Sequence, residues 1–167
     1  MSDPKNTGRR AARERALSLL YEAQSKGQTM GAVLAALPTA PDSFSVELIT
    51  GVEAQQPVLD ELIGRFARGW RLERMPQLDL AILRMASFEL CERPDVPTAA
   101  IISEAVELAK RFSTDNSGRF VNGVLASIAT AVRPGVDPTG VSPRPRPGRS
   151  AGSAGPGETS EESSGSS

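Results

Sequence analysis

The sequence predicts an all-α fold, a bundle of about seven helices over residues 9–133 that is followed by a disordered tail. Apolar residues recur at helical spacing in one segment after another, and glycine or proline ends most of these segments. No stretch alternates apolar and polar residues with a period of two, and β-branched residues are scattered. Residues 134–167 are rich in proline, glycine and serine, a composition that cannot bury enough apolar surface to fold.

The first four predicted helices are separated by glycine and proline. A flexible start over residues 1–8 precedes the first helix, which begins at Arg9 and for which Gly27 is the expected C-terminal cap. A short helix ends before Pro38, and a longer one follows the next loop. Pro57 is expected to start or kink the fourth helical segment, because proline removes one backbone donor and clashes with the preceding turn.

The second half of the folded part holds the predicted centre of the bundle. Residues 75–93 are apolar nearly all round, which is typical of a helix buried among others. Two further helices are predicted over residues 99–112 and 117–132. Trp70 is expected in the core or at a boundary between subdomains. Gly123 interrupts the last helix, and close approach of a neighbouring helix is its expected explanation.

Composition argues against catalysis. The chain has no histidine and a single cysteine, Cys91, so the commonest general base and the usual zinc ligands are missing. Glycines occur singly and form no phosphate-binding loop. We therefore expect no enzyme activity, no cofactor and no metal. The lone cysteine suits a reducing compartment and no apolar run approaches the length of a membrane span, which favours a cytoplasmic protein without a membrane partner.

An arginine-rich start favours nucleic-acid binding. The formal net charge is −1, but cations are concentrated in the first residues of the chain. Arg9, Arg10 and Arg13 share one side of the first predicted helix and could follow a phosphate backbone. Cations at a helix N-terminus oppose the helix dipole, so they do not serve to stabilise the helix. The alternative is a solvated helix start whose charges serve solubility.

The start of the last predicted helix carries a second candidate feature. Phe120 lies at the edge of the apolar stripe and directly follows Arg119 in the sequence. An exposed aromatic ring beside a cation and the free N–H groups of a helix start could stack an unpaired base and hold its phosphate. The alternative for Phe120 is a peripheral position in the core.

Three segments resemble the NusB family of bacterial transcription antitermination factors: RRAARERALSLLYE, LAILRMASFELCERPDVPTAAIISEAVELAKRFS and SGRFVNGVLASI. The resemblance covers residues 9–133, and its most specific part is the order VP, EAVELAKRF and FVNGVL at close spacing. It implies two helical subdomains, no enzyme activity and binding of the boxA element of ribosomal RNA leader transcripts. It also implies partners: NusE, which is a small-subunit ribosomal protein, RNA polymerase and other Nus factors.

The resemblance also implies an RNA surface. It makes the three arginines of the first helix phosphate contacts and makes Phe120 a stacking side chain with Arg119 beside it. Many relatives have an acidic residue where this chain has Asn116, and loss of that charge beside a phosphate site should favour RNA. A surface facing NusE would include Glu73 and Asp79, at the exposed edge of the central helix and its approach.

Two other interpretations stay open at this point. The same helical module occurs as the RNA-binding part of ribosomal RNA cytosine methyltransferases, although Cys91 lies in a helical pattern that suits a buried structural role better than a nucleophile. Some family members form homodimers that would cover the arginine-rich face. The chain would then be a self-associating scaffold with little affinity for RNA.

Overall fold

The all-α prediction is confirmed by the computed structural model, which describes residues 4–138 and contains no strand in that range. Six α-helices and one 3-10 helix follow one another along the chain: α1 (Pro4–Lys26), α2 (Met30–Ala35), α3 (Ser43–Phe66), η1 (Leu72–Arg74), α4 (Gln77–Glu92), α5 (Thr98–Phe112) and α6 (Ser117–Val132). α1 begins before Arg9, within the segment expected to be flexible. The predicted tail lies outside the described residues, apart from residues 134–138.

The expected start of a new helix at Pro57 is wrong, and this lowers the number of α-helices in the described residues to six. α3 runs without interruption through Pro57, which lies on the exposed face of the helix. Val52 and Leu59 on either side of it are 2% and 1% exposed. Packing of these side chains on both sides of the proline outweighs its local cost, which is how tertiary structure commonly overrides helix propensity.

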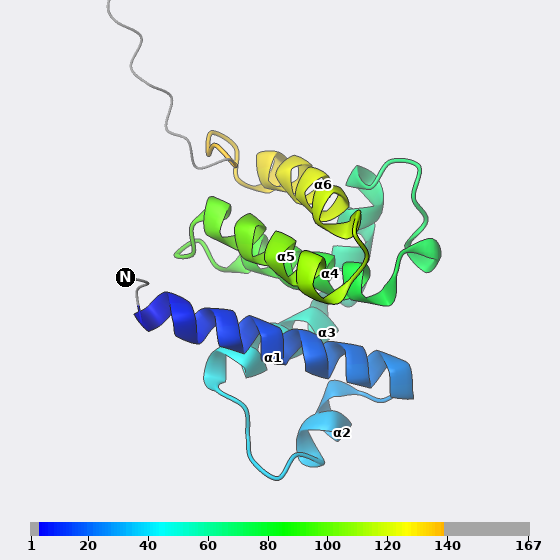
Figure 1. Ribbon diagram of the computed structural model, residues 1–167, viewed down its shortest axis with the longest axis vertical. Helices are drawn as coiled ribbons and strands as arrows, with labels where there is room; N and C mark the ends of the chain where they lie inside the picture. The colour runs from blue at the N-terminus through cyan, green and yellow to red at the C-terminus, as the bar shows by residue number, and fades with distance from the viewer. Residues whose placement is uncertain (1–3, 139–167) are drawn as a thin grey trace, which may run out of the picture.

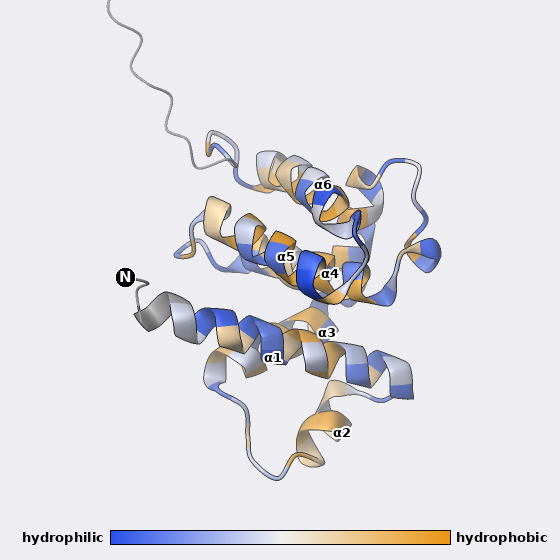
Figure 2. Cartoon of the chain, in the orientation of Figure 1, coloured by the Kyte–Doolittle hydropathy of each residue, from blue (hydrophilic) through white to orange (hydrophobic). Residues whose placement is uncertain are grey.

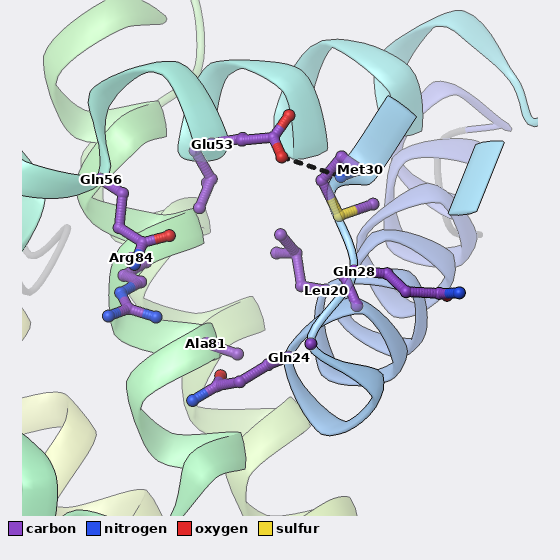
Figure 3. Close-up of a pocket in the computed structure, with 11 residues that line it drawn as sticks. Leu20, Gln24, Gln28, Met30, Glu53, Gln56, Ala81 and Arg84 are labelled. Carbon is purple, nitrogen blue, oxygen red and sulfur yellow. Dashed lines mark hydrogen bonds between the residues drawn. The ribbon is translucent and has the colours of Figure 1, made fainter. Parts of the chain in front are cut away.

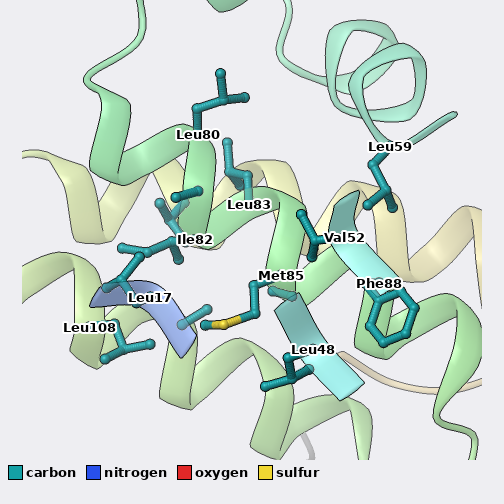
Figure 4. Packing of buried hydrophobic residues seen from close by; sticks show 14 of the residues in the cluster. Leu17, Leu48, Val52, Leu59, Leu80, Ile82, Leu83, Met85, Phe88 and Leu108 are labelled. Atoms are coloured by element: carbon teal, nitrogen blue, oxygen red, sulfur yellow. The ribbon is translucent and has the colours of Figure 1, made fainter. Parts of the chain in front are cut away.

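The helices form two groups, α1–α3 and α4–α6, as the resemblance implied (Figure 1). α4 lies at the centre and contacts α1, α3, α5 and α6. Eleven of its sixteen residues are buried, which confirms the expected central helix. One continuous apolar core joins the two groups, and Figure 4 shows α4 side chains such as Met85 between Leu17 of α1 and Leu48 of α3.

The contact between α3 and α4 depends on a glycine. A Cβ atom at Gly51 would stand 2.3 Å from the ring of Phe88, so only a residue without a side chain permits this approach. Apolar residues of both helices belong to the buried core, and Figure 2 shows hydrophilic colour in the N-terminal half of α1. Burial of the α4 side chains against α3 is the main physical reason that the two groups pack as one body.

An arginine fixes the end of α6 against the end of α4. The guanidinium of Arg133 donates to the backbone oxygens of Glu89 (3.1 Å), Leu90 (2.8 Å), Arg93 (2.7 Å) and Val96 (2.7 Å). These carbonyls lie in the last turn of α4 and just after it. The oxygens of Glu89 and Arg93 also accept backbone N–H groups, from Arg93 and Val96, so the guanidinium completes the capping of this helix end. The orientation of α6, which carries the FVNG segment, is therefore set by hydrogen bonds as well as by the core.

Candidate nucleic-acid interface

Two of the predicted phosphate contacts lie on the surface at the start of α1. Arg10 holds Glu104 of α5 through two nitrogens, with distances of 2.8–3.2 Å, and its side chain stays 57% exposed. The hydrogen bonds that Arg10 donates to Glu104, together with the negative charge of that carboxylate, raise the pKa of Arg10 above its ordinary value. Arg9 lies 3.4 Å from Asp95 and is 37% exposed. Both guanidinium groups can therefore meet a phosphate from solvent.

Arg13 does not belong to this surface, which corrects the prediction. Its side chain is 4% exposed and donates to both carboxylate oxygens of Glu89, at 2.7 and 3.0 Å. Glu89 lies on the buried face of α4 and is itself 1% exposed. A buried charge needs a partner of opposite sign, and Arg13 supplies it. Arg13 thus joins α1 to α4 and is shielded from a phosphate backbone in this structure.

Carboxylates also surround Arg93, which lies near the start of α1. The guanidinium of Arg93 bonds to Asp95 at 3.0 Å and also to Glu47. Arg9, Arg13 and Arg93 all lie within 5.6 Å of the ring centroid of Phe44, which packs among them. The arginine-rich start is therefore less positive as a surface than the sequence suggests, because its partners come from helices distant in the sequence.

The start of α6 is anchored by Asp79, which corrects a second prediction. Asp79 is 3% exposed and lies in the first turn of α4, so it is not at an exposed edge. Its carboxylate accepts hydrogen bonds from Ser113 and, at 2.9 Å, from Ser117. The bonds hold the α5–α6 loop against α4. Glu73, the other predicted partner contact, is exposed on η1 beside Arg71 and Arg74.

The predicted stacking site lies on the exposed side of this anchored turn. Asn116 and Arg119 are exposed, and the side chain of Asn116 makes no capping hydrogen bond to α6. Phe120 is half-buried, with part of its ring against the core. The expected peripheral position in the core is therefore observed for part of the Phe120 side chain, and the rest is accessible from solvent.

The structure brings a further aromatic residue to this place. Trp70 is 55% exposed and its ring centroid lies 5.5 Å from that of Phe120, at an interplanar angle of 55°. Trp70 was expected in the core or at a boundary between subdomains, and its exposure contradicts the core position. The two residues are distant in sequence, and spacing alone could not pair them. Figure 1 shows the segment that follows α3 beside α6.

Gly123 is also explained differently from the prediction. A Cβ atom at this position would meet nothing within 4 Å, so no helix approaches closely there. The close approach occurs instead at Gly118, where a Cβ atom would lie 2.9 Å from Cγ of Lys110. Gly123 lies on the exposed face of α6 and lines a groove together with Trp70 and Phe120.

The two parts of the predicted RNA surface lie apart in the structure. Arg10 contacts Glu104, in the middle of α5, whereas Phe120 contacts Trp70, beyond the end of α3. The two parts therefore lie on different elements, and α5 separates α1 from the start of α6 in sequence.

A second pocket lies between α1, α3 and α4, with a volume of about 230 Å³ (Figure 3). Its charged groups already have partners. Glu53 accepts a hydrogen bond from the backbone N–H of Met30 at 2.8 Å, and Arg84 pairs with Asp60 at 2.6 Å. These contacts hold α2 and α4 against α3, so the pocket is explained by the fold.

Two findings concern the described range as a whole. Between residues 4 and 138 no helix combines the length and the apolar character that a membrane crossing requires. The same range holds no cluster of three or more cysteine, aspartate or glutamate side chains that could ligate a metal ion.

Comparison with known proteins agrees with the fold. A sequence model of the NusB family matches residues 10–130. The transcription antitermination protein NusB of Saccharopolyspora erythraea is 46% identical over 127 residues, covering 72% of this chain and 86% of the relative. The protein of the same name from Myxococcus xanthus is 40% identical over 134 residues, with 74% and 96% covered. A solved structure of T. maritima NusB is 31% identical with a TM-score of 0.64, covering 78% of this chain and 93% of that chain. On the family match, the identities and the shared helical architecture, the chain belongs to the NusB family.

Proposed function

We propose that this chain is a transcription antitermination factor that binds the boxA element of ribosomal RNA leader transcripts. The observation that carries the proposal is the start of α6, where half-buried Phe120 adjoins exposed Arg119. Within residues 4–138 no carboxylate pairs with Arg119, so its charge is available to a phosphate. An aromatic ring held on one side by the core loses little freedom when a base stacks on the other side.

Arg9 and Arg10 supply the second part of the proposed RNA surface. Each is paired with a carboxylate but remains partly exposed, so a phosphate can share or replace that partner. Phosphate contacts of this kind release counterions, and binding through them weakens as the salt concentration rises. Asn116 contributes by the absence of a negative charge at the start of α6. Arg13 is left out of the proposal because it is buried.

The proposed partners follow the family and the names of the relatives. We place NusE, a small-subunit ribosomal protein, on the surface that includes Glu73, and RNA polymerase with the other Nus factors in the same complex. Glu73 is exposed on η1, so a partner can reach it. A protein with this function would act in the cytoplasm, where bacterial transcription takes place.

A homodimeric scaffold is the alternative that a specific observation favours. Tyr21 and Phe112 are 42% and 40% exposed and border one shallow apolar pocket on the side of α1 that faces α5. A second copy could cover them. The relatives described above are antitermination proteins, which favours the RNA-binding function over a methyltransferase module.

The proposal is tested by measuring affinity for a boxA RNA and for a scrambled RNA of equal length, each with and without NusE. We expect tighter binding to boxA and a further gain when NusE is present. Light scattering on the same samples reports the oligomeric state. Equal affinity for both RNAs, together with a dimer that RNA does not dissociate, would establish the scaffold instead.

Two substitutions separate the parts of the surface. Phe120→Ala is expected to weaken boxA binding by about 1–3 kcal/mol, the usual contribution of one stacked base. Arg10→Gln is expected to lower the dependence of log affinity on log salt by about 0.7, one phosphate contact to a single strand. Circular dichroism serves as the control for folding. If Phe120→Ala unfolds and RNA binding follows the folded fraction, Phe120 is a core residue and its proposed role fails.

A further inference from the structure

The proposed stacking residues, Arg119 and Phe120, line one side of a groove whose other residues the proposed function does not use. We call it the Trp70 groove. Its lining includes Arg68, Trp70, Arg119, Phe120 and Gly123, and it has a volume of about 720 Å³. It runs between the turn that ends α3 and the exposed face of α6. The groove is open to solvent along its length.

The charge of the Trp70 groove is positive and uncompensated. Arg68 and Arg119 line it, and no aspartate or glutamate does. In the part of the chain that the structure describes, neither arginine takes part in an ion pair. This differs from the start of α1, where Arg9 and Arg10 both have carboxylate partners. A polyanion would find free guanidinium groups here without displacing a carboxylate.

The indole of Trp70 is exposed but held in place. α3 ends in a turn in which the backbone N–H of Trp70 donates to the backbone oxygen of Ala67 at 3.1 Å. Gly69 has a φ of +78°, a backbone conformation that favours glycine and turns the chain back toward α6. The tilted contact with Phe120 then fixes the indole from one side. A ring ordered in this way presents its free side to solvent.

Gly123 keeps the groove open. It lies in the middle of α6, where alanine would favour the helix more, and a Cβ atom there would meet no neighbour. The position therefore has no packing reason to be glycine. Any side chain at 123 would project into the space beside Phe120 and Trp70.

We propose that the Trp70 groove binds single-stranded RNA next to the base at Phe120: Trp70 stacks a second unpaired base and Arg68 contacts its phosphate. Successive bases on aromatic rings along a positively charged groove are the usual arrangement for unpaired nucleic acid. The inference rests on the proposed function, because it extends the RNA surface along α6. It predicts that the bound strand enters the space that Gly123 leaves free.

The tryptophan itself is the reporter. Trp70 is the only tryptophan of the chain, so its emission describes this groove alone. Titration of the full chain with boxA RNA should quench that emission, with the same dissociation constant as the anisotropy of a labelled RNA. Binding seen by anisotropy with no change in Trp70 emission would overturn the inference and leave the proposed function standing. Absence of binding in both measurements would overturn both. A change caused by NusE alone, and not by RNA, would assign the groove to a protein.

Variants test each part of the groove. Trp70→Ala should weaken RNA binding about 5- to 150-fold, whereas Trp70→Phe should recover most of it. Arg68→Gln should lower the salt dependence of log affinity by about 0.7. The matched controls are Phe112→Ala, which removes an aromatic ring that also lies against an arginine, and Arg65→Gln, which removes a nearby exposed cation outside the groove. Neither control should change the affinity for RNA by more than about 2-fold.

Substitutions of Gly123 distinguish a role in RNA binding from a role in folding, because they should change affinity without lowering stability. Gly123→Ala and Gly123→Leu should leave the thermal stability equal or higher, because both residues favour a helix and meet open space. The same variants should progressively weaken RNA binding, with leucine at least about 10-fold weaker by the stacking it blocks. If Gly123→Leu is stably folded and binds RNA as well as the unchanged chain, no strand occupies the groove and the inference fails.

Discussion

Removal of Arg13 should affect stability and leave RNA binding by the folded protein unchanged. Both members of the ion pair are nearly inaccessible, at 4% and 1% exposure, and two hydrogen bonds of 2.7 and 3.0 Å join them. Arg13→Met would leave the carboxylate of Glu89 buried without a partner. Loss of one member of such a pair costs about 3–5 kcal/mol, a large part of the stability of a domain of this size.

A double variant measures how strongly Arg13 and Glu89 depend on each other. Arg13→Met with Glu89→Leu removes both charges and fills the space with apolar atoms, and such replacements are often neutral or stabilising by about 1–4 kcal/mol. We therefore expect the double variant to be at least as stable as the unchanged chain and far more stable than Arg13→Met. Urea unfolding of the four proteins measures the coupling between the two residues directly.

RNA binding distinguishes a buried, structural Arg13 from the phosphate contact that the sequence suggested. The double variant should bind boxA with unchanged salt dependence, because a buried guanidinium releases no counterion. Arg10→Gln should lower that dependence, as described above. If Arg13→Met retained its stability within about 1 kcal/mol and lowered the salt dependence as Arg10→Gln does, Arg13 would reach the RNA and the reasoning would be refuted.

Three further predictions concern the ends of helices. Asn116→Asp should weaken boxA binding several-fold while raising thermal stability slightly, because a negative charge repels phosphate but favours a helix start; equal affinity of the two forms would contradict this. Partial burial tends to raise the pKa of Asp42, but hydrogen bonds from Ser45 outweigh it and hold that pKa below its ordinary value. This stabilisation is therefore present above the pKa of the unfolded chain and is lost as the pH falls through the lowered folded value. Asp42→Ala should cost about 1 kcal/mol at neutral pH, with the deficit shrinking in acid-unfolding curves; a deficit that is constant with pH would refute it. Arg133→Met should cost about 2 kcal/mol in urea unfolding, because it removes the side-chain donors to the oxygens of Leu90 and Val96, whereas those of Glu89 and Arg93 keep backbone donors; a loss below about 0.5 kcal/mol would count against that role.

Much of the fold could be predicted because it depends on local patterns. The apolar character of residues 75–93 predicted the central helix α4, and the cap at Gly27 appears with a φ of +62°. Pro57 was misjudged because its local cost is real, and only the burial of Val52 and Leu59 shows that α3 continues past it. Local patterns predict an element when residues near in sequence determine it. They fail where the free energy of packing against other helices exceeds the local preference.

The candidate site divides in the same way. Phe120 and Arg119 adjoin in sequence, and their expected place at the edge of a helix start is where the structure has them. Trp70 was expected in the core or at a boundary between subdomains, and nothing within its own segment indicates contact with α6. Gly123 was expected to admit a neighbouring helix, and only the open space around it in the structure connects it with this face.

The sequence by itself determined the class of fold, the order of the helices and the family, because helical periodicity, capping residues and the FVNG segment are all local features. Tertiary structure alone decided which charges are free. Arg13 and Asp79 read as surface charges along the chain, yet each is buried against a partner from another helix, while Arg68 and Arg119 have none within residues 4–138. The reason is physical: the cost of a buried charge is met by contacts between residues far apart in sequence, and only the packed helices show which of those contacts form.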